Sequence, residues 1–436
     1  VLHQTGQGHD NSHRGLTDEP ILQAYEMDGS LLWEINLGKN IREGAHYTQF
    51  MVYDLDGDGI SEIACKTAPG TKDGTGAFLS KGPAASDDDQ ADYRMKEGRS
   101  KGYILSGPEY LTIFDGKTGK ELATTKYIPP RIEGTTEYDP KKMDELWGDD
   151  YGNRVDRFLA CIAYLDGKKP SVVMCRGYYT RTVLAAWNWR DGELNHVWTF
   201  DSNDPGKEEY AGQGNHNLAV GDADQDGYDE IIYGAMAIDH DGTGLYTTGM
   251  GHGDAGHLGD LDPNHPGLEY FMPHERKGPE APGVSFRDAG TGDILWEYKN
   301  PEDVGRGVAA DISPLHNGAE AWASSGMGPY NVKGEAIKGM PSSMNFLVWW
   351  DGDELRELLD KNHIDKFGKG RLLTAEECAS NNWTKANPSL SADILGDWRA
   401  ELIWRTKDNQ SLRIYTTTIP TNRRLYTLMH DPVSRL

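Results

Sequence analysis

The sequence predicts an all-β protein built as a β-propeller, and two alternating motifs carry this prediction. The first motif is an acidic, glycine-containing loop between two apolar, strand-like segments. The second is an Asp-Gly or Thr-Gly hairpin between aromatic-rich runs. One copy of each motif makes a four-stranded unit of roughly 40 to 55 residues, which is the period of a propeller blade. The 52 glycines and 21 tyrosines agree with many short strands joined by turns.

The acidic loop occurs in two close copies and several looser ones. Residues 54–63 and 222–231 share the spacing D-x-D-x-D-G-x-x-E-I. Looser copies lie at 259–271, 310–323 and 392–404, and a reduced copy lies at 163–174. Each copy ends in an acidic or polar residue that leads into an apolar strand. The repetition indicates a structural element that most blades share.

The composition of this loop suits a hard cation. Oxygens at positions 1, 3 and 5, a glycine at 6 and one more carboxylate match a cation with six to eight oxygen ligands, and calcium fits best. The closing glutamate stands at position 9 and not at 12, so the loop is not an EF-hand. An Asp-Gly turn without an ion is the alternative interpretation. The predicted calcium ligands are Asp54, Asp56, Asp58, Glu62, Asp222, Asp224, Asp226, Glu230, Asp260, Asp262, Asn264, Glu269 and Asp393.

The chain is strongly acidic, with a formal net charge of −25 from 69 acidic and 44 basic side chains. This charge argues against nucleic acid or an anionic membrane as a partner. It also argues against a polyanionic substrate unless bound cations offset it, and six calcium-loaded loops would offset about half of the excess. No apolar run approaches the roughly 18 residues of a membrane-spanning helix.

The hairpin motif alternates with the acidic loops along the chain. It occurs at 25–35, 114–125, 187–200, 287–298 and 348–358. Three longer segments interrupt the period, at 68–102, at 131–157 with a short helical pattern, and at 360–391. Such insertions in a propeller lie on one face and shape the site there. No linker is visible, so a single propeller domain over 1–436 is expected.

Four cysteines, Cys65, Cys161, Cys175 and Cys378, are too few for a disulfide scaffold. Free, buried thiols are the favoured interpretation. A single bridge between Cys161 and Cys175 is the alternative.

Histidines stand at matching places in two successive repeats. His216 precedes the loop at 222–231, while His252, Asp254 and His257 precede the next loop. Glycine-flanked histidines at matching places would converge near the axis of a propeller. A structural role is the alternative for each of them, and it is favoured for His257.

Two basic residues are further candidates for a reaction centre. Arg306 is bracketed by glycines and followed by an apolar strand, which suits capture of a carboxylate by the guanidinium. Pairing of Arg306 with a loop acid is the alternative. Lys385 ends the segment 360–391 just before a strand, and composition alone makes it an ordinary surface lysine.

Five motifs together resemble the bacterial rhamnogalacturonan lyases of polysaccharide lyase family 11, over essentially the whole chain. In chain order they read HYTQFMVYDLDGDGISEIACKTAPGT, GQGNHNLAVGDADQDG, GHGDAGHLGDLDPNHPGLE, VGRGVAADI and LSADILGDWRAELIW. The resemblance implies an eight-bladed propeller with many calcium ions. It also implies cleavage of the galacturonic acid–rhamnose bond of rhamnogalacturonan I, a pectin backbone, by β-elimination.

The resemblance also implies roles for single residues. Arg306 and Lys385 are the catalytic pair, and His216, His252 and Asp254 form the active-site and metal shell. Lys385 is the easier choice of base, because nearby cations and burial lower a lysine pKa whereas arginine stays protonated; both assignments stay open. The residues assigned to substrate binding are Asn215, Asn382, Trp383 and Thr384. The family pattern has glycine where this chain has Trp383, whose ring suits stacking on a sugar.

Further expectations come from the same resemblance. The protein is expected to be bacterial, monomeric, and secreted, periplasmic or on the cell surface. The terminal blades are expected to be incomplete in this chain, because family members continue past LMHDPVSRL (428–436) with a tail rich in tyrosine and proline. Segment 274–288 lies where endo- and exo-acting members differ, and both modes stay open. A non-catalytic calcium-dependent propeller that binds glycan or protein is the main alternative, followed by a glycoside hydrolase with two carboxylates at the scissile bond.

Overall fold

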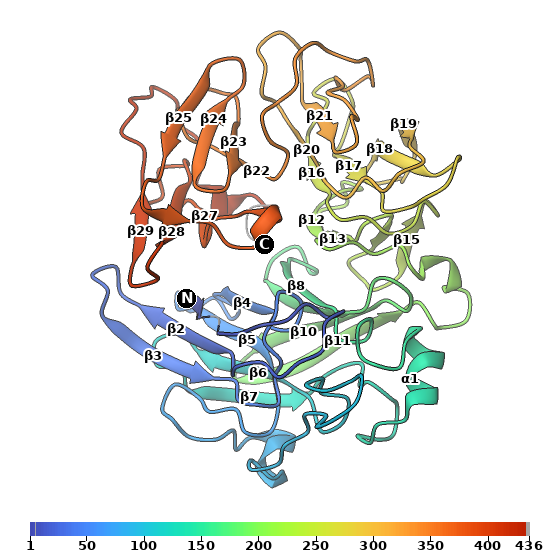
Figure 1. Cartoon of the computed structure of the whole chain (residues 1–436), viewed down its shortest axis with the longest axis vertical. Coiled ribbons are helices and arrows are strands. Elements are labelled where there is room, and N and C mark those ends of the chain that lie inside the picture. Colours follow the sequence, from blue (N-terminus) through green and yellow to red (C-terminus); the bar gives the residue numbers. More distant parts are fainter. Residues whose placement is uncertain (5, 433–436) are drawn as a thin grey trace. The chain divides into compact units, whose positions relative to one another are not determined.

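The computed structural model describes residues 1–4 and 6–432, and its regular structure is almost entirely β (Figure 1). The chain forms two compact units. Unit 1 is Val1–Gly214 with Gly227–Asp229 and Ile238–Gly244, and unit 2 is Asn215–Asp226, Glu230–Ala237 and Leu245–Leu436. A single catalytic domain over 1–436 stays a prediction. The last four residues of the 428–436 segment lie outside the described residues.

Unit 1 contains three sheets whose neighbouring strands follow one another in the chain. The first has β1 (Leu2–Gln4), β2 (Ile21–Tyr25) and β3 (Leu31–Asn36). The second has β4 (Phe50–Tyr53), β5 (Glu62–Thr67), β6 (Tyr110–Asp115) and β7 (Glu121–Lys126). The third has β8 (Phe158–Ala163), β9 (Ser171–Arg176), β10 (Val183–Arg190) and β11 (Glu193–Asp201).

Unit 2 contains five sheets, apart from the turn that joins β14 to β15. The first two are β12 (Ala219–Gly221), β13 (Glu230–Ile232), β14 (Met236–Ile238) and β15 (Gly244–Thr247), then β16 (His257–Gly259), β17 (Glu269–Pro273), β18 (Pro282–Asp288) and β19 (Ile294–Lys299). The third is β20 (Gly307–Ala310) with β21 (Glu320–Ala323). The last two are β22 (Phe346–Val348), β23 (Glu357–Asp360), β24 (His363–Lys366) and β25 (Gly370–Thr374), then β26 (Cys378–Ala379), β27 (Leu390–Ala392), β28 (Glu401–Thr406) and β29 (Leu412–Tyr415).

The all-β propeller class is confirmed, but the expected count of eight blades is wrong. Seven sheets have three or four strands and qualify as blades, while the sheet β20–β21 has only two. The chain after β21 makes only single bridges, from Ala321 to Tyr330 and from Tyr330 to Ala336. The segment 324–341 contains four glycines and two prolines, which disfavour the regular ladder of a third and fourth strand.

The strands of a blade differ in burial according to their place in the sheet. Second strands such as β9 (SVVMCR) are buried throughout and are apolar in their middle, and they have a paired strand on both edges. Fourth strands such as β19 (ILWEYK) are mostly exposed. The core therefore follows the inner strands, and the polar surface follows the outer ones.

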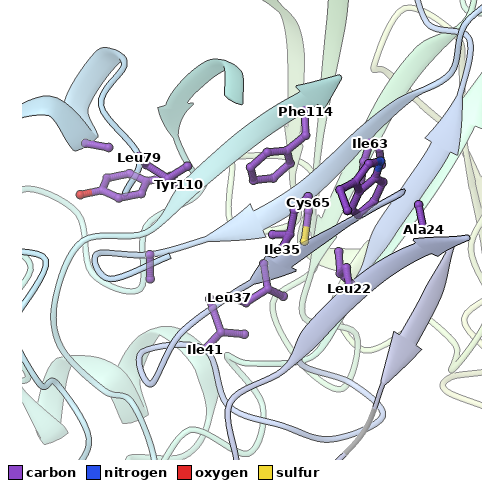
Figure 2. Packing of buried hydrophobic residues seen from close by; sticks show 13 residues of the cluster. Leu22, Ala24, Ile35, Leu37, Ile41, Ile63, Cys65, Leu79, Tyr110 and Phe114 are labelled. Atoms are coloured by element: carbon purple, nitrogen blue, oxygen red, sulfur yellow. The ribbon is translucent and has the colours of Figure 1, made fainter. Parts of the chain in front are cut away.

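The core of unit 1 shows how neighbouring sheets pack. Leu22 and Ile35 from the first sheet lie against Ile63 and Phe114 from the second, and all four are at most 1% exposed (Figure 2). Burying a side chain of this size stabilises the fold by about 1.5–3 kcal/mol relative to leaving it exposed. Such clusters hold neighbouring sheets together within unit 1.

All five predicted hairpins join neighbouring antiparallel strands, and four of them, β2–β3, β6–β7, β10–β11 and β18–β19, stand where the motif places them. The fifth, 348–358, joins β22 to β23 and stands where other blades carry the acidic loop, so its predicted place in the blade is wrong. The hairpin of that blade is β24–β25, inside the expected insertion 360–391. Asp-Gly favours a turn in both places, so the dipeptide alone does not tell which turn of the blade it makes.

The other two long segments carry little regular structure. Segment 68–102 joins β5 to β6 and contains a short 3-10 helix, Gly82–Ser86. Segment 131–157 contains α1 (Pro140–Trp147), which Asp139 caps by accepting the backbone N–H groups of Lys141 and Lys142. None of the described helices has the length and apolar composition needed to cross a membrane.

All four cysteines are buried free thiols, as the favoured interpretation predicted. Cys161 on β8 pairs with Val173 in the ladder, while Cys175 on β9 pairs with Leu159. The two cysteines therefore lie on neighbouring strands but not opposite one another.

Candidate functional site

In unit 2, the strand that leads into each acidic loop, called the first strand of its sheet here although β26 precedes β27 in the last sheet, carries different chemistry at its two ends. The chain just before four of these strands, β12, β16, β20 and β27, contains in turn His216, Asp254, Arg306 and Lys385. The chain just after the same strands forms the loops 222–230, 260–269, 311–320 and 393–401. We call the end before the strand the mixed end, because its residue types differ from strand to strand. We call the end after the strand the acidic end, because it repeats one acidic pattern.

The acidic end is built around a buried glutamate that begins the second strand of the sheet. Its carboxylate accepts a backbone N–H from the loop, as Glu62 does from Leu55 at 2.8 Å and Glu230 does from Ala223 at 2.7 Å. The six glutamates of this kind are Glu62, Glu230, Glu269, Glu320, Glu357 and Glu401. None is more than 4% exposed, so each loop closes over a buried acid.

Glu62, Glu230 and Glu320 are surrounded by further acids in their loops. Burial and the neighbouring Asp224 together raise the pKa of Glu230 to about 8. Burial likewise raises the pKa of Glu62 to about 7 and that of Glu320 to about 7. One carboxylate oxygen each of Glu230 and Glu320 is buried without a hydrogen-bond partner. Buried oxygens of this kind are the ligands that a hard cation takes up.

Two of the predicted cation loops gather their oxygens closely. Carboxylate oxygens of Asp54, Asp56 and Asp58 lie within 4.8 Å of one another, and so do those of Asp222, Asp224 and Glu230. Neither Glu62 nor Asp226 joins the group of its own loop at that distance. These acidic clusters could bind metal ions.

Two other predicted metal sites are not gathered in this way, and the structure differs from expectation there. Asp260, Asp262 and Glu269 form no such group, and Glu269 instead faces the imidazole of His265 at 3.0 Å. Asp393 accepts the backbone N–H groups of Asp397 and Trp398, as in an ordinary turn. Cation binding by these two loops therefore stays a prediction.

The mixed end contains a second kind of cluster, formed by His216, His252, Asp254 and Glu275, whose ligand atoms lie within 4.8 Å of one another. The Nε2 atom of His216 lies 3.2 Å from Oδ1 of Asp254, and the Nε2 atom of His252 lies 3.2 Å from Oε2 of Glu275. The two imidazole rings are 5.0 Å apart. The hydrogen bond from His252 lowers the pKa of Glu275.

Backbone contacts hold this cluster together. The His216 N–H donates to Gly253 O at 3.3 Å, and the Glu275 N–H donates to His252 O at 2.9 Å. A carbon atom added at Gly305 would lie 3.2 Å from Oδ2 of Asp254, so glycine leaves the room that this carboxylate occupies. The cluster is therefore positioned by the chain and not by chance contacts of long side chains.

Lys385 and Arg306 meet beside the same cluster. The Lys385 Nζ lies 2.8 Å from Oδ2 of Asp254. The Arg306 guanidinium donates to the carbonyl oxygen of Thr384 at 2.9 Å and to its hydroxyl at 2.8 Å. Arg306 thereby holds the turn that carries Lys385. All the predicted catalytic residues, Arg306, Lys385, His216 and His252, thus lie in one place within unit 2.

The residues assigned to substrate binding fall into two groups. Trp383 is 92% exposed, and both Asn382 and Trp383 adopt left-handed φ values of 53° and 50°. Thr384 is exposed as well. Asn215, in contrast, is completely buried and its side chain accepts the His216 N–H at 2.9 Å. In this structure Asn215 positions His216, and its contact with substrate stays a prediction.

Three residues near the site escaped the sequence prediction. Glu275 follows β17, and its position beside two basic residues gave no metal signal. Asp303 lies near Asp254 and Glu275; burial raises its pKa, and those two carboxylates raise it further. Asn345 precedes β22, and its side chain donates to Thr384 O at 3.4 Å. A search for polar residues just before each first strand would have found Asn345.

His257 has the structural role that the sequence favoured. Its Nε2 atom lies 3.1 Å from the carbonyl oxygen of Gly307 on the neighbouring sheet. Burial lowers the pKa of this imidazole to about 4, so it is neutral at physiological pH. It lies in β16, between the mixed end and the acidic end of that strand.

The donor set of the mixed cluster suits a divalent cation, because two imidazoles and two carboxylates supply four ligand atoms. Beside it, one ammonium and one guanidinium supply positive charge and hydrogen-bond donors for a carboxylate. A site with these parts fits an anionic substrate despite the acidic charge of the whole chain.

Comparison with known proteins agrees with this chemistry. The family model "Rhamnogalacturonan lyase family 11, C-terminal domain" matches residues 1–436. The rhamnogalacturonan endolyase YesW of Bacillus subtilis (strain 168) is 58% identical over 433 residues, which cover 98% of this chain and 66% of that protein. The rhamnogalacturonan exolyase YesX of the same organism is 56% identical over 448 residues, covering 98% and 70%.

A solved structure supports the same relation. The crystal structure of rhamnogalacturonan lyase YesW matches 98% of this chain and 70% of that chain, with a TM-score of 0.90 and 58% identity. The chain thus spans about two thirds of the length of its curated relatives. On the match of the family model over its whole length, the chain belongs to rhamnogalacturonan lyase family 11.

Proposed function

We propose that this chain is the catalytic propeller of a pectin-degrading rhamnogalacturonan lyase. It cleaves the galacturonic acid–rhamnose bond of rhamnogalacturonan I by β-elimination. The observation that carries the proposal is the position of Lys385, 2.8 Å from Asp254 on a turn held by Arg306. The names of the relatives support the substrate and the reaction class.

The reaction sets clear demands on the site. The C5 proton beside a uronate carboxylate is only weakly acidic, so the carboxylate must be neutralised before the proton can leave. A base then takes the C5 proton, the C4–C5 double bond forms, and the C4–O4 bond to rhamnose breaks. The leaving oxygen takes up a proton from solvent and becomes the hydroxyl of the released rhamnose end. The product carries a 4,5-unsaturated galacturonate end.

The residues of the site divide these tasks. Arg306 donates to the substrate carboxylate with N–H groups that Thr384 does not use. Lys385 is the base, since a lysine can lose its proton near other cations and arginine cannot. Asp254 orients the Lys385 amine, and His216 and His252 orient Asp254.

Divalent cations complete the proposal in two places. His216, His252, Asp254 and Glu275 would hold one ion, which would add positive charge beside the uronate carboxylate. Calcium in the acidic loops, foremost 54–62 and 222–230, has a structural task, since it compensates buried carboxylates. Calcium is favoured in these loops because all their side-chain donors are oxygens.

Trp383 provides a further substrate contact in this proposal. Its indole is almost fully exposed, two residues before Lys385. An exposed aromatic ring in this place offers a stacking surface for a sugar of the bound chain.

Two expectations about the protein's setting are kept as proposals. The substrate is a cell-wall polymer, so we place the enzyme outside the cell, at its surface or in the periplasm of a bacterium. We also propose that it acts as a monomer, since every residue assigned to the reaction belongs to unit 2 of one chain.

The proposal is tested by incubating the protein with rhamnogalacturonan I and calcium while following ultraviolet absorbance of the unsaturated product. We expect a rise that a chelator abolishes and that Lys385→Met and Arg306→Ala each remove. Lys369→Met, which removes an exposed lysine in the turn after β24, is the matched control and should leave the rise intact.

Two other outcomes would support the alternative functions, a glycoside hydrolase or a binding module. Reducing ends without the absorbance would indicate a hydrolase. Binding of the polysaccharide without cleavage would indicate a calcium-dependent binding module. Loss of the circular dichroism and thermal transition in the Lys385 or Arg306 variants would contradict their catalytic assignment.

A further inference from the structure

One acidic loop contains its own cation. In loop 349–357, between β22 and β23, the Lys366 side chain is only 1% exposed and its Nζ points into the loop. The Nζ lies 3.1 Å from Asp351, 2.6 Å from Asp353 and 2.5 Å from Glu357. A fourth oxygen, the carbonyl of Leu355, lies at 3.3 Å.

This loop is built like the loop 54–62 in unit 1. The paired residues that bracket the two loops are Tyr53 with Glu62 and Val348 with Glu357, a spacing of nine residues in both. In each loop the glutamate accepts the N–H of the residue two beyond the first strand. Position for position, Asp351 corresponds to Asp56, Asp353 to Asp58, and Leu355 to Ile60.

The four oxygens around the ammonium are therefore those of a calcium loop. They come from positions 3, 5, 7 and 9, with a backbone carbonyl at position 7, which is the pattern of oxygen ligands around calcium in a short acidic loop. Position 1, which is Asp54 in the first loop, is Trp349 here. The loop has lost one carboxylate and gained one internal positive charge.

The third strand of the sheet explains where this charge comes from. In two other blades an aspartate lies opposite the buried glutamate, Asp115 opposite Glu62 and Asp288 opposite Glu269. Lys366 is the last residue of β24, just as each aspartate is the last residue of its strand. It lies one step beyond the pair Leu358–Asp365 in the ladder, which places it opposite Glu357. At this position the chain carries a cation where those two blades carry an anion.

We propose that the Lys366 ammonium permanently occupies the cation position of loop 349–357, so that this loop is stabilised without calcium. The substitution Lys366→Asp then converts the loop into a calcium site. The inference rests on the proposed binding of calcium by the sister loops. The ammonium offsets one of the three carboxylate charges, contacts all three carboxylates, and occupies the position between them that a further cation would need. The two loops that gather their oxygens, 54–62 and 222–230, have no lysine among the gathered groups, and in the proposal they take an ion from solution.

The calcium content of matched variants tests this proposal. Each protein is equilibrated with calcium, passed through gel filtration at a fixed free calcium concentration, and analysed for calcium per chain. We expect Lys366→Asp to bind one more calcium per chain than the unchanged protein, and Lys366→Arg to bind no more. Lys366→Asp that folds and gains none would overturn the proposal.

A second pair of variants decides the matter even where Lys366→Asp does not fold. Asp58→Asn, in loop 54–62, should lower the calcium content by one or weaken that site, whereas the equivalent change Asp353→Asn should leave the calcium content unchanged. A lower content in Asp353→Asn contradicts the proposal, because loop 349–357 would then hold calcium already. If the unchanged protein binds no calcium at all, the role of the sister loops fails, and this inference fails with it.

Discussion

The two ends of the first strands in unit 2 differ in what they repeat. The end that leads into the second strand carries a buried glutamate and an acidic loop in every case, from 222–230 to 393–401. The opposite end carries a different group on each strand: histidine, aspartate, arginine and lysine. Repetition indicates a feature that most sheets need for their own stability, whereas a group found at a single strand has no such general task.

This difference separates stability from chemistry along one strand. The acidic end contains oxygen donors almost alone, with the acids buried and their pKa values raised. The mixed end brings imidazole, carboxylate, ammonium and guanidinium groups within hydrogen-bond reach of one another. Variants at the two ends should therefore fail in different assays, and four predictions examine whether they do.

The largest effect is expected at the mixed end, from Asp254→Asn. The amide loses the charge that orients the Lys385 amine and the His216 imidazole, so we expect a fall in kcat/KM of at least about 100-fold, or roughly 2.7 kcal/mol of transition-state stabilisation. The melting temperature should change by no more than about 2 °C. Lyase kinetics and thermal denaturation at saturating calcium measure both quantities.

The matched change at the acidic end is Asp224→Asn, which also replaces an aspartate by its amide. It should retain activity at saturating calcium and lose thermal stability when calcium is limiting. If Asp254→Asn unfolds the protein, or if Asp224→Asn abolishes activity at full calcium, the two ends are not separable as we describe.

The second effect concerns calcium and stability at the acidic end. Removing calcium should destabilise the unchanged protein, by about 2.7 kcal/mol for a site that had been held at 100 times its Kd. Glu230→Gln should reduce this dependence, because it removes a buried carboxylate whose oxygen has no partner. In chelator the same variant should be as stable as the unchanged protein or more stable, since no buried charge remains uncompensated.

Denaturant unfolding with and without calcium measures the effect of Glu230→Gln on the free energy of unfolding, which should be destabilising with calcium and neutral or stabilising without it. Equal destabilisation by Glu230→Gln in both conditions would show that Glu230 is a hydrogen-bonding residue only. The activity of the variant at saturating calcium serves as the control for the mixed end of the same strand.

The third effect concerns pH and the residue between the two ends, His257. Its pKa is about 4 in the folded protein, against about 6.5 when unfolded, so the unfolded state binds the proton more readily. The stability that depends on the neutral imidazole is thus fully present above pH 6.5 and is lost as the pH falls towards 4. The loss should be on the order of 1–3 kcal/mol.

His257→Gln keeps a side-chain N–H for the Gly307 carbonyl but cannot titrate. As the pH falls from 6.5 to 4, the free energy of unfolding of the variant should rise relative to that of the unchanged protein. Because both proteins share all other titrating groups, the difference isolates His257. A difference that does not change with pH would contradict the burial of a neutral imidazole.

The sequence predicted the repeated parts of the molecule better than the single parts. Acidic loops and hairpins are local, since Asp, Gly and the following strand determine the turn within about ten residues. The local signal failed at 348–358, where Asp-Gly stands in the loop that Lys366 fills from another strand. Glu275, Asp303 and Asn345 escaped prediction because tertiary structure, and no local pattern, brings them to the site.

The smallest effect is expected at Trp383, at the mixed end. Its φ of 50° is a left-handed value that costs a residue with a side chain about 1 kcal/mol more than glycine, so Trp383→Gly should stabilise the protein by up to that amount. If the exposed indole stacks on a sugar, the same variant should raise KM several-fold while kcat changes little, since the ring does not contact the reacting atoms. Trp383→Ala removes the ring and keeps the strain, so it should raise KM equally without the gain in stability. Unchanged KM in both variants would remove Trp383 from the substrate site and leave the mixed end defined by Arg306, Lys385 and the histidine cluster alone.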